Sequence, residues 1–149
     1  MTNFENTTFT NIDKDIQKYV NDVLSGEETA GEAIRLACKR FKDWFDRKDF
    51  WFDNEKVNKV IDFIGHLKHF EDEFAGQPFI LLPWQKWIIA NIFGWYRADD
   101  HNKRVIRNVF LLISRKNGKT ALSAAIMLAS MIVDGIQGAE CYLVANSRD

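Results

Sequence analysis

Cysteine is scarce in this chain of 149 residues, and long apolar runs are missing. The two cysteines, Cys38 and Cys141, stand far apart in apolar surroundings, which argues against a disulfide framework and predicts reduced, buried thiols. The longest apolar helix that we expect, residues 121–133, is shorter than the ~20 residues needed to cross a bilayer. The polar N-terminus also lacks the apolar centre of a signal peptide. We therefore expect no membrane segment.

Net charge is nearly absent, because 20 Lys and Arg offset all but one of 21 Asp and Glu. The charges are divided unevenly: residues 1–100 hold 13 basic and 18 acidic side chains, a balance of −5, and residues 101–149 hold 7 and 3, a balance of +4. No acidic residue stands between His101 and Lys119, where six Lys or Arg occur. This stretch could meet the phosphates of a nucleotide or nucleic acid. Lys103, Arg104 and Arg107 fit a solvated strand entrance equally well.

Apolar residues recur at helical spacing in the first two thirds of the chain, and most of the aromatic residues among them suit core packing. We expect helices over residues 13–24, 29–48, 56–67 and 83–94. Asp53 suits the N-cap of the third helix, and Ser25-Gly26 ends the first. Pro83 suits the first turn of the fourth helix, and Gly94 suits its end. Residues 96–103 then predict a charged loop.

His66 and His69 come three residues apart, just before the acidic residues 71–73. Such spacing can place two imidazoles on one helix face, where they could bind a metal ion. The stronger interpretation is a helix end, where a histidine meets the negative end of the helix dipole before a polar turn.

The most informative stretch runs from Val105 to Thr120. Residues 105–113 are rich in β-branched and aromatic side chains and predict a buried strand. Residues 121–134 predict a helix. The loop between them, residues 114–120, ends in Gly-Lys-Thr, so the order of strand, loop and helix is that of a Walker-type phosphate loop.

Each residue of this loop end suits the chemistry of phosphate binding. Gly118 lets the backbone approach a phosphate, Lys119 can contact the β- and γ-phosphates, and the Thr120 hydroxyl can bind Mg²⁺. The match is partial, because the first glycine of the Walker pattern falls at position 113, which is Ile113. The alternative is an ordinary turn before a helix.

A second strand is predicted over residues 140–145, which makes a β-α-β unit with a parallel strand pair. The fold class that we expect is α/β: an incomplete P-loop NTPase fold preceded by a mainly α-helical N-terminal region. The predicted division is a helical region over residues 1–73 and the start of a P-loop ATPase domain over residues 74–149.

Gln85 falls in the first turn of the helix predicted over residues 83–94. Its amide could donate to and accept from the edge of an adenine, and Trp84 or a neighbour could pack on the face of the base. Taken alone, a glutamine in a helix is a solvated residue.

Three stretches in this order resemble the N-terminal part of the large terminase subunit of tailed bacteriophages. Residues 74–79, leading into Leu82-Pro83-Trp84-Gln85-Lys86, are similar to the adenine-recognising glutamine motif of that family, and residues 92–95 follow at its usual distance. Residues 114–120 resemble its deviant Walker A loop, in which Arg replaces part of the glycine run. Residues 142–149 resemble its next strand and loop.

The resemblance implies ATP and Mg²⁺ as cofactors, with Gln85 reading adenine. Arg115 resembles the loop arginine that senses or stabilises the γ-phosphate, although a loop residue contacting a nearby carboxylate would look the same. Catalytic roles are thus expected for Arg115 and Lys119, and Thr120 is the metal ligand. The expected nucleotide contacts are Trp84, Gln85, Ser114, Lys116, Asn117, Gly118, Lys119 and Thr120.

Two features of such a motor are missing from the sequence. No apolar strand ends in Asp-Glu, which would hold Mg²⁺ and orient the attacking water, and no acidic cluster of a nuclease is present. We therefore expect a truncated ATPase part that binds ATP without hydrolysing it efficiently. The resemblance implies double-stranded viral DNA, the small terminase subunit and the portal as partners. It also implies a homo-oligomeric motor, encoded by a phage or prophage and working in the cytoplasm of a bacterial host.

Two other interpretations stay open. Residues 10–70 could form a non-catalytic module that docks the small terminase subunit or the portal, with the loop as a remnant. A helicase-like ATPase also combines a glutamine motif with a Walker loop, but the long separation of Gln85 and Lys119 fits a terminase better.

Overall fold

The computed structural model of the chain describes residues 7–69, 76–114, 117–135, 138, 140–142 and 144. Within these residues the fold is mixed α/β, which confirms the α/β class at that level. In chain order the elements are η1 (Phe9–Asn11), α1 (Lys14–Ser25), α2 (Glu32–Asp43), η2 (Trp44–Asp46), β1 (Phe50–Phe52), α3 (Asn54–Gly65), α4 (Pro83–Gly94), β2 (Trp95–Arg97), β3 (Asp100–Arg104) and α5 (Lys119–Ile132).

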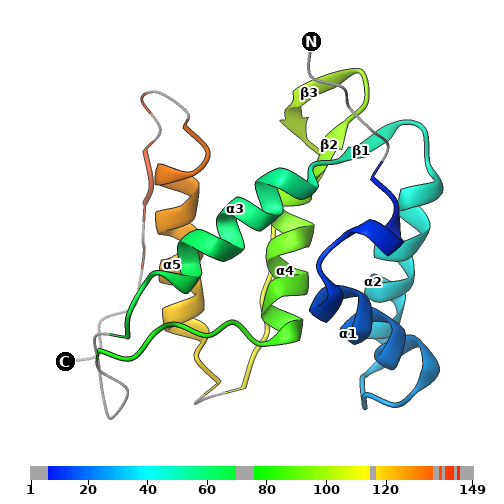
Figure 1. Ribbon diagram of the computed structural model, residues 1–149, viewed down its shortest axis with the longest axis horizontal. Helices are drawn as coiled ribbons and strands as arrows, with labels where there is room; N and C mark the ends of the chain where they lie inside the picture. Colours follow the sequence, from blue (N-terminus) through cyan, green and yellow to red (C-terminus); the bar gives the residue numbers. More distant parts are fainter. Residues whose placement is uncertain are drawn as a thin grey trace.

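Helix α4 stands at the centre of the molecule. The α1–α2 pair packs on one side of it, and α3 and α5 lie on the other (Figure 1). Trp87, Ile89, Ala90 and Phe93 are all buried, so apolar side chains leave this helix in several directions. A helix that is apolar all round belongs in a core. Its position is therefore fixed by packing from both sides.

The helix ends follow from local chemistry, and the predicted cap at Asp53, end at Gly26 and start at Pro83 are confirmed. Asp13 caps α1 by accepting from the backbone N–H groups of Asp15 and Ile16, and Asp53 accepts from Lys56 N at 2.8 Å at the start of α3. Gly26, with φ of +88°, ends α1 in the left-handed conformation that glycine adopts readily. Helix α4 begins at Pro83, as expected.

The sheet was not predicted. Strands β1, β2 and β3 form an antiparallel sheet in that order, with Phe52 opposite Trp95 and Tyr96 opposite Arg104. The prediction of a charged loop over residues 96–103 is therefore wrong, because its two ends pair as a hairpin. Trp95 is buried among the rings of α2, η2 and β1. This packing explains why so short a sheet is held in place.

Among the described residues, two hydrophobic clusters form the core, and each joins residues from both sides of the predicted boundary at residue 73. The first includes Val20 and Phe41 with Trp87, and the second includes Ile64 with Ile89. Both clusters meet at α4. The division into a helical region and an ATPase region stays a prediction.

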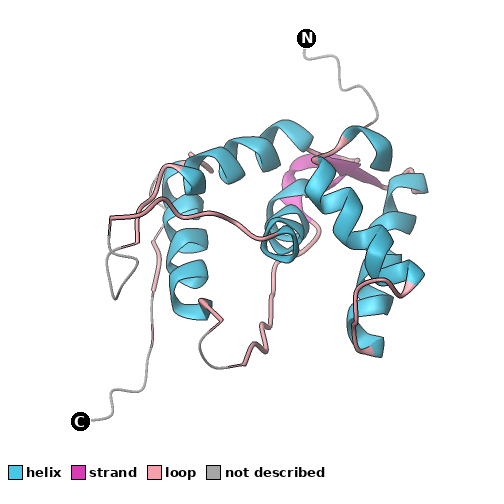
Figure 2. Cartoon of the chain, turned by 60° about the horizontal axis from the view of Figure 1, so that its bottom comes forward, coloured by secondary structure: helices cyan, strands magenta, loops and turns pink. Residues whose placement is uncertain are grey.

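The strand predicted over residues 105–113 is wrong for this structure. Residues 106–114 join no ladder, and the described residues from Glu140 to Val144 belong to no strand either. These two segments lie on opposite sides of α5 rather than as a parallel pair (Figures 1 and 2). A strand needs a hydrogen-bonded neighbour, and the described residues place none beside residues 106–114. Phe110 and Leu112 are consequently 87% and 88% exposed.

A buried carboxylate joins α3, β3 and the end of α5. The side chain of Asp134 is 7% exposed, and its Oδ1 lies 3.0 Å from Lys56 Nζ while both its oxygens accept from Arg104. Lys56 also donates to the carbonyl of Val133 at 2.9 Å. The Arg104 guanidinium lies over the ring of Phe93, 4.6 Å from its centroid, which adds α4 to the group. We call Lys56, Arg104 and Asp134 the Asp134 clamp.

Replacement of Asp134 by alanine should destabilise the protein by about 3 kcal/mol, because it leaves two partly buried cations without a counter-charge. Urea unfolding followed by circular dichroism measures this change. Asp99→Ala is the matched control, since Asp99 pairs with Arg97 while both side chains are more than half exposed; it should leave the unfolding midpoint nearly unchanged. Equal effects of the two substitutions would contradict a structural role for the clamp.

The two free thiols should react at very different rates. Cys38 is buried, as predicted, and burial raises its pKa to about 11, whereas Cys141 is exposed, so the prediction of burial is wrong there. Since thiolate is the reactive form, Ellman's reagent at pH 8 should titrate one thiol per chain rapidly and the second only after urea is added. The Cys141→Ser variant should show no rapid phase. Two rapid thiols would contradict the burial of Cys38.

Candidate functional site

The candidate site forms where residues 105–114 turn into α5. Gly118 caps this helix with φ of +66°, and its carbonyl accepts from Leu122 N at 2.9 Å, so the helix begins directly after it. Before the helix, the Asn117 amide donates to Ser114 Oγ at 2.6 Å. Arg115 and Lys116, between these two residues, lie outside the described residues.

Lys119 and Thr120 occupy the first turn of α5, and both are exposed. In the part of the chain that the structure describes, neither side chain makes a hydrogen bond or ion pair. The first turn of α5 also carries no acidic residue. The positive end of the helix dipole, an ammonium group and a hydroxyl are therefore available at one place, which suits an anion.

Gln85 lies next to this helix start although 33 residues separate it from Gly118 in the sequence. A Cβ atom built on Gly118 would lie 4.0 Å from Gln85 Nε2, and apart from the adjoining residues and the backbone of α5, no other described atom would be closer. Gln85 is only 5% exposed, and its Oε1 accepts from Leu82 N at 2.9 Å. The N-termini of α4 and α5 thus lie at the same end of the molecule (Figure 1).

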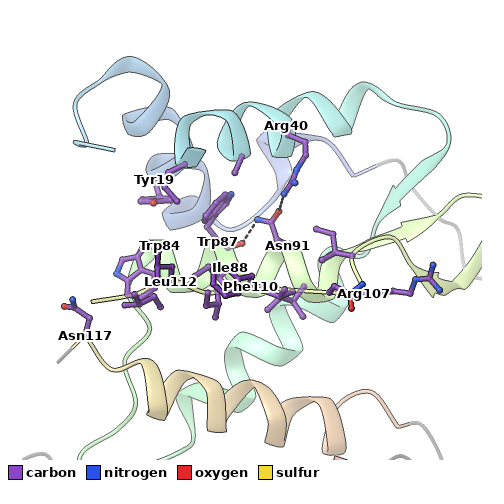
Figure 3. Close-up of a pocket in the computed structure, with 18 of the residues that line it drawn as sticks. Tyr19, Arg40, Trp84, Trp87, Ile88, Asn91, Arg107, Phe110, Leu112 and Asn117 are labelled. Atoms are coloured by element: carbon purple, nitrogen blue, oxygen red, sulfur yellow. Dashed lines mark hydrogen bonds between the residues drawn. The ribbon is translucent and has the colours of Figure 1, made fainter. Parts of the chain in front are cut away.

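A groove of about 950 Å³ separates the α1–α2 pair and α4 from residues 105–114. Trp84 and Asn117 lie at one end of it, and Arg107 lies at the other (Figure 3). Ser114 lines the groove as well, whereas Gln85, Gly118, Lys119 and Thr120 do not. The structure therefore divides the predicted contacts between the groove and the start of α5.

A hydrogen-bonded pair at the groove was not predicted. Asn91 is buried in α4, where its amide donates to the Trp87 carbonyl at 2.9 Å, and its oxygen accepts from Arg40 at 3.5 Å. The charged residues that line the groove are Arg40 and Arg107. A polar residue inside the apolar run of residues 87–93 was the available sequence signal for Asn91.

The three basic residues Lys103, Arg104 and Arg107 make different contacts in the structure. Lys103 pairs with Asp100 at the surface, 3.1 Å away, and Arg104 belongs to the Asp134 clamp. Arg107 alone among these three reaches the groove. Ion pairing inside the protein therefore accounts for two of the residues considered for phosphate contact.

The two histidines considered for a metal site make other contacts in the structure. His66 Nδ1 lies 2.8 Å from the carbonyl of Asp62, and His69 stacks on Phe79 with ring centroids 4.8 Å apart. The acidic residues 71–73 lie outside the described residues. Where the chain is described, no three His, Cys, Asp or Glu side chains gather in a way that could hold a metal ion. Nor does that part contain a helix with the length and apolar character of a membrane span.

Comparison with known proteins identifies the second half of the chain. Residues 83–149 match the family model of the terminase large subunit, ATPase domain. This stretch is thus similar to the ATPase region of a terminase large subunit, which confirms the resemblance carried by its motifs. It begins at the first residue of α4 and includes the loop and α5. A search of curated proteins found no match. A search of solved structures found none either.

Gly118→Ala should destabilise the protein by about 1 kcal/mol, because an L-residue rarely adopts φ of +66°. Space is not the reason, since the added methyl group meets nothing closer than 4.0 Å. Gly65→Ala at the end of α3 is the control; its φ is not positive, no atom lies within 4 Å, and a neutral or slightly stabilising effect is expected. Thermal unfolding compares the two variants. A stabilising Gly118→Ala would show that the left-handed turn is not required.

Proposed function

We propose that this chain binds ATP with Mg²⁺ at the start of α5, as the nucleotide-binding part of a terminase motor that moves double-stranded viral DNA into a procapsid. The family match supports ATP use and DNA packaging as its setting. The observation that carries the proposal is the juxtaposition of Gly118, Lys119 and Thr120 at a helix start free of acidic residues.

The residues at this helix start fit a nucleotide phosphate. Gly118 leaves space beside the backbone, Lys119 would place its ammonium against the β- and γ-phosphates, and Thr120 would offer its hydroxyl to Mg²⁺. When bound, Mg²⁺ offsets the charge of the phosphate oxygens. Both side chains reach solvent without competing partners among the described residues, so they need no rearrangement to meet a ligand.

The remaining predicted contacts extend the same proposal. Ser114 and Asn117 are hydrogen-bonded to each other beside the loop. The half-buried ring of Trp84 lines the neighbouring end of the groove. Arg115 would stabilise charge on the γ-phosphate, and Lys116 would add a further positive charge. These two roles rest on the sequence pattern, because both residues lie outside the described residues.

Binding without efficient turnover is the activity we propose for this chain. Hydrolysis needs a carboxylate near Mg²⁺ and another near the attacking water. Asp134 stands past the far end of α5, about 20 Å from Thr120 at the rise of an α-helix, and it is held by the Asp134 clamp. It therefore serves the fold rather than the nucleotide.

We propose the partners of the complete motor on the same grounds. They are viral DNA, the small terminase subunit and the portal, with several copies of the large subunit acting together in the cytoplasm of a bacterial host. A docking role for the helical region is a second candidate. It is favoured by the exposed apolar residues Ile34 and Leu36 on α2, which are 38% and 60% exposed.

Lys119→Ala should weaken binding of a fluorescent ATP analogue in the presence of Mg²⁺ by at least about tenfold, because one charge-assisted contact to phosphate is lost. Lys103→Ala is the matched control, since Lys103 is an exposed lysine of the same basic stretch that pairs with Asp100. It should bind as the wild type does. Phosphate release on the same samples should stay near background.

Equal affinity of the wild type and Lys119→Ala would contradict the proposed site. If neither protein binds the analogue while both unfold cooperatively, nucleotide binding is excluded for this chain and the docking candidate gains support. Rapid phosphate release that depends on Lys119 would instead contradict the assignment of binding without turnover.

A further inference from the structure

We propose that Lys86 is a positioning residue for the nucleotide site, because it joins the start of α4 to the start of α1 through Asp13 and Asp15. The inference rests on the proposed function. It adds α1 to the support of the site, although α1 lies before residues 83–149, which match the family model. The affinity for ATP should therefore depend on two carboxylates of the helical region.

Lys86 forms two ion pairs with residues that lie 71 and 73 positions away in the sequence. Its Nζ atom lies 2.5 Å from Asp15 Oδ2 and 3.3 Å from Asp13 Oδ2. The side chains of Lys86 and Asp13 are 17% and 22% exposed, whereas that of Asp15 is 55% exposed. Burial lowers the pKa of Lys86, but the hydrogen bond to Asp15 and the charge of Asp13 outweigh burial and raise the pKa above its usual value. The ammonium group is therefore held in its charged form between two carboxylates.

The carboxylate of Asp13 has a fixed orientation. Its Oδ1 atom accepts from the backbone N–H groups of Asp15 and Ile16, at 2.8 and 3.2 Å, and so caps α1. Its Oδ2 atom accepts from Lys86. Turning this carboxylate away from Lys86 would break the capping bonds as well. An exposed pair of two mobile side chains directs little, but a short side chain held by its cap defines where the ammonium group lies.

The place of Lys86 in α4 also favours a contact between helices. Lys86 is the fourth residue of α4, and the first turn of this helix carries no acidic residue. A cation is unfavourable there, because it meets the positive end of the helix dipole. The carboxylates that offset its charge come from α1, whose start lies beside the start of α4 (Figure 1). The ion pairs therefore join two helices.

The two residues before Lys86 connect this contact to the candidate site. Gln85 lies beside Gly118 at the start of α5, and Trp84 lines the groove. Trp84, Gln85 and Lys86 share the first turn of α4, so a shift of this turn moves all three side chains. Apolar packing also joins α1 to α4, but hydrophobic contact has no preferred direction. The ion pairs supply the direction that the packing lacks.

Equilibrium binding of the fluorescent ATP analogue with Mg²⁺ tests this role in the full chain. Lys86→Met should weaken binding by about five- to tenfold, because the first turn of α4 is released from α1. Asp15→Asn should weaken it by about two- to fivefold, since the pair with Asp13 remains. The double variant should bind as Lys86→Met does, because no ion pair is left for the second substitution to break.

The sign of the Asp15→Asn effect separates positioning from charge alone. Removing a carboxylate near the site would favour an anionic ligand by its charge, whereas the loss of a positioning contact weakens binding. Lys86→Arg keeps the positive charge and should restore most of the affinity that is lost in Lys86→Met. Asp22→Asn is the matched control, since Asp22 pairs with Lys18 within α1; its affinity should stay within about twofold of the wild type.

Circular dichroism on the same samples measures the melting temperature and shows which variants are folded in the assay. A lower melting temperature of Lys86→Met with unchanged affinity would reduce the ion pairs to a structural role. Tighter binding by Asp15→Asn would show that charge alone links these residues to the ligand, and additive losses in the double variant would contradict a shared contact. If Lys86→Met does not fold, the exposed Asp15 decides the question. A wild type that binds no better than Lys119→Ala would contradict the proposed function itself.

Discussion

The buried carboxylate of Asp134 is the interaction on which the arrangement of the helices depends. It holds Lys56 from α3 and Arg104 from β3, and Arg104 in turn covers Phe93 of α4. A charge this deeply buried is stable only when its partners are in place. Contacts among these three side chains therefore fix the position of the end of α5. Because the helix is rigid, they also fix the position of its start, where it follows the loop.

The central helix α4 also helps to fix the geometry of the candidate site. Because α4 is packed from two sides, its first turn presents Gln85 at a fixed place beside Gly118. A helix start that carries lysine and threonine, with an amide from a second helix start beside it, is a compact arrangement for an anion. In the proposed function, the groove that begins at Trp84 and Asn117 would hold the rest of the nucleotide.

Features that depend on near neighbours in the chain were predictable. The caps Asp13 and Asp53, the start of α4 at Pro83 and the helix after the Gly-Lys-Thr triplet all follow from local chemistry. The sheet was not predictable in this way, because Phe52 and Trp95 pair across more than forty residues. The roles of Lys119 and Thr120 stay predictions, whereas that of Asp134 could not be foreseen, since its cations come from two distant elements.

Residues 106–114 have a mechanical consequence for the loop that they precede. Paired strands are stiff, but this segment has no ladder, and three of its apolar side chains are exposed. The segment before the loop is thus compliant, whereas α5 after it is rigid. A force applied at the start of α5 would pass along the helix into the carboxylate at its far end, and from there into α3 and β3. The segment before the loop would transmit little of it.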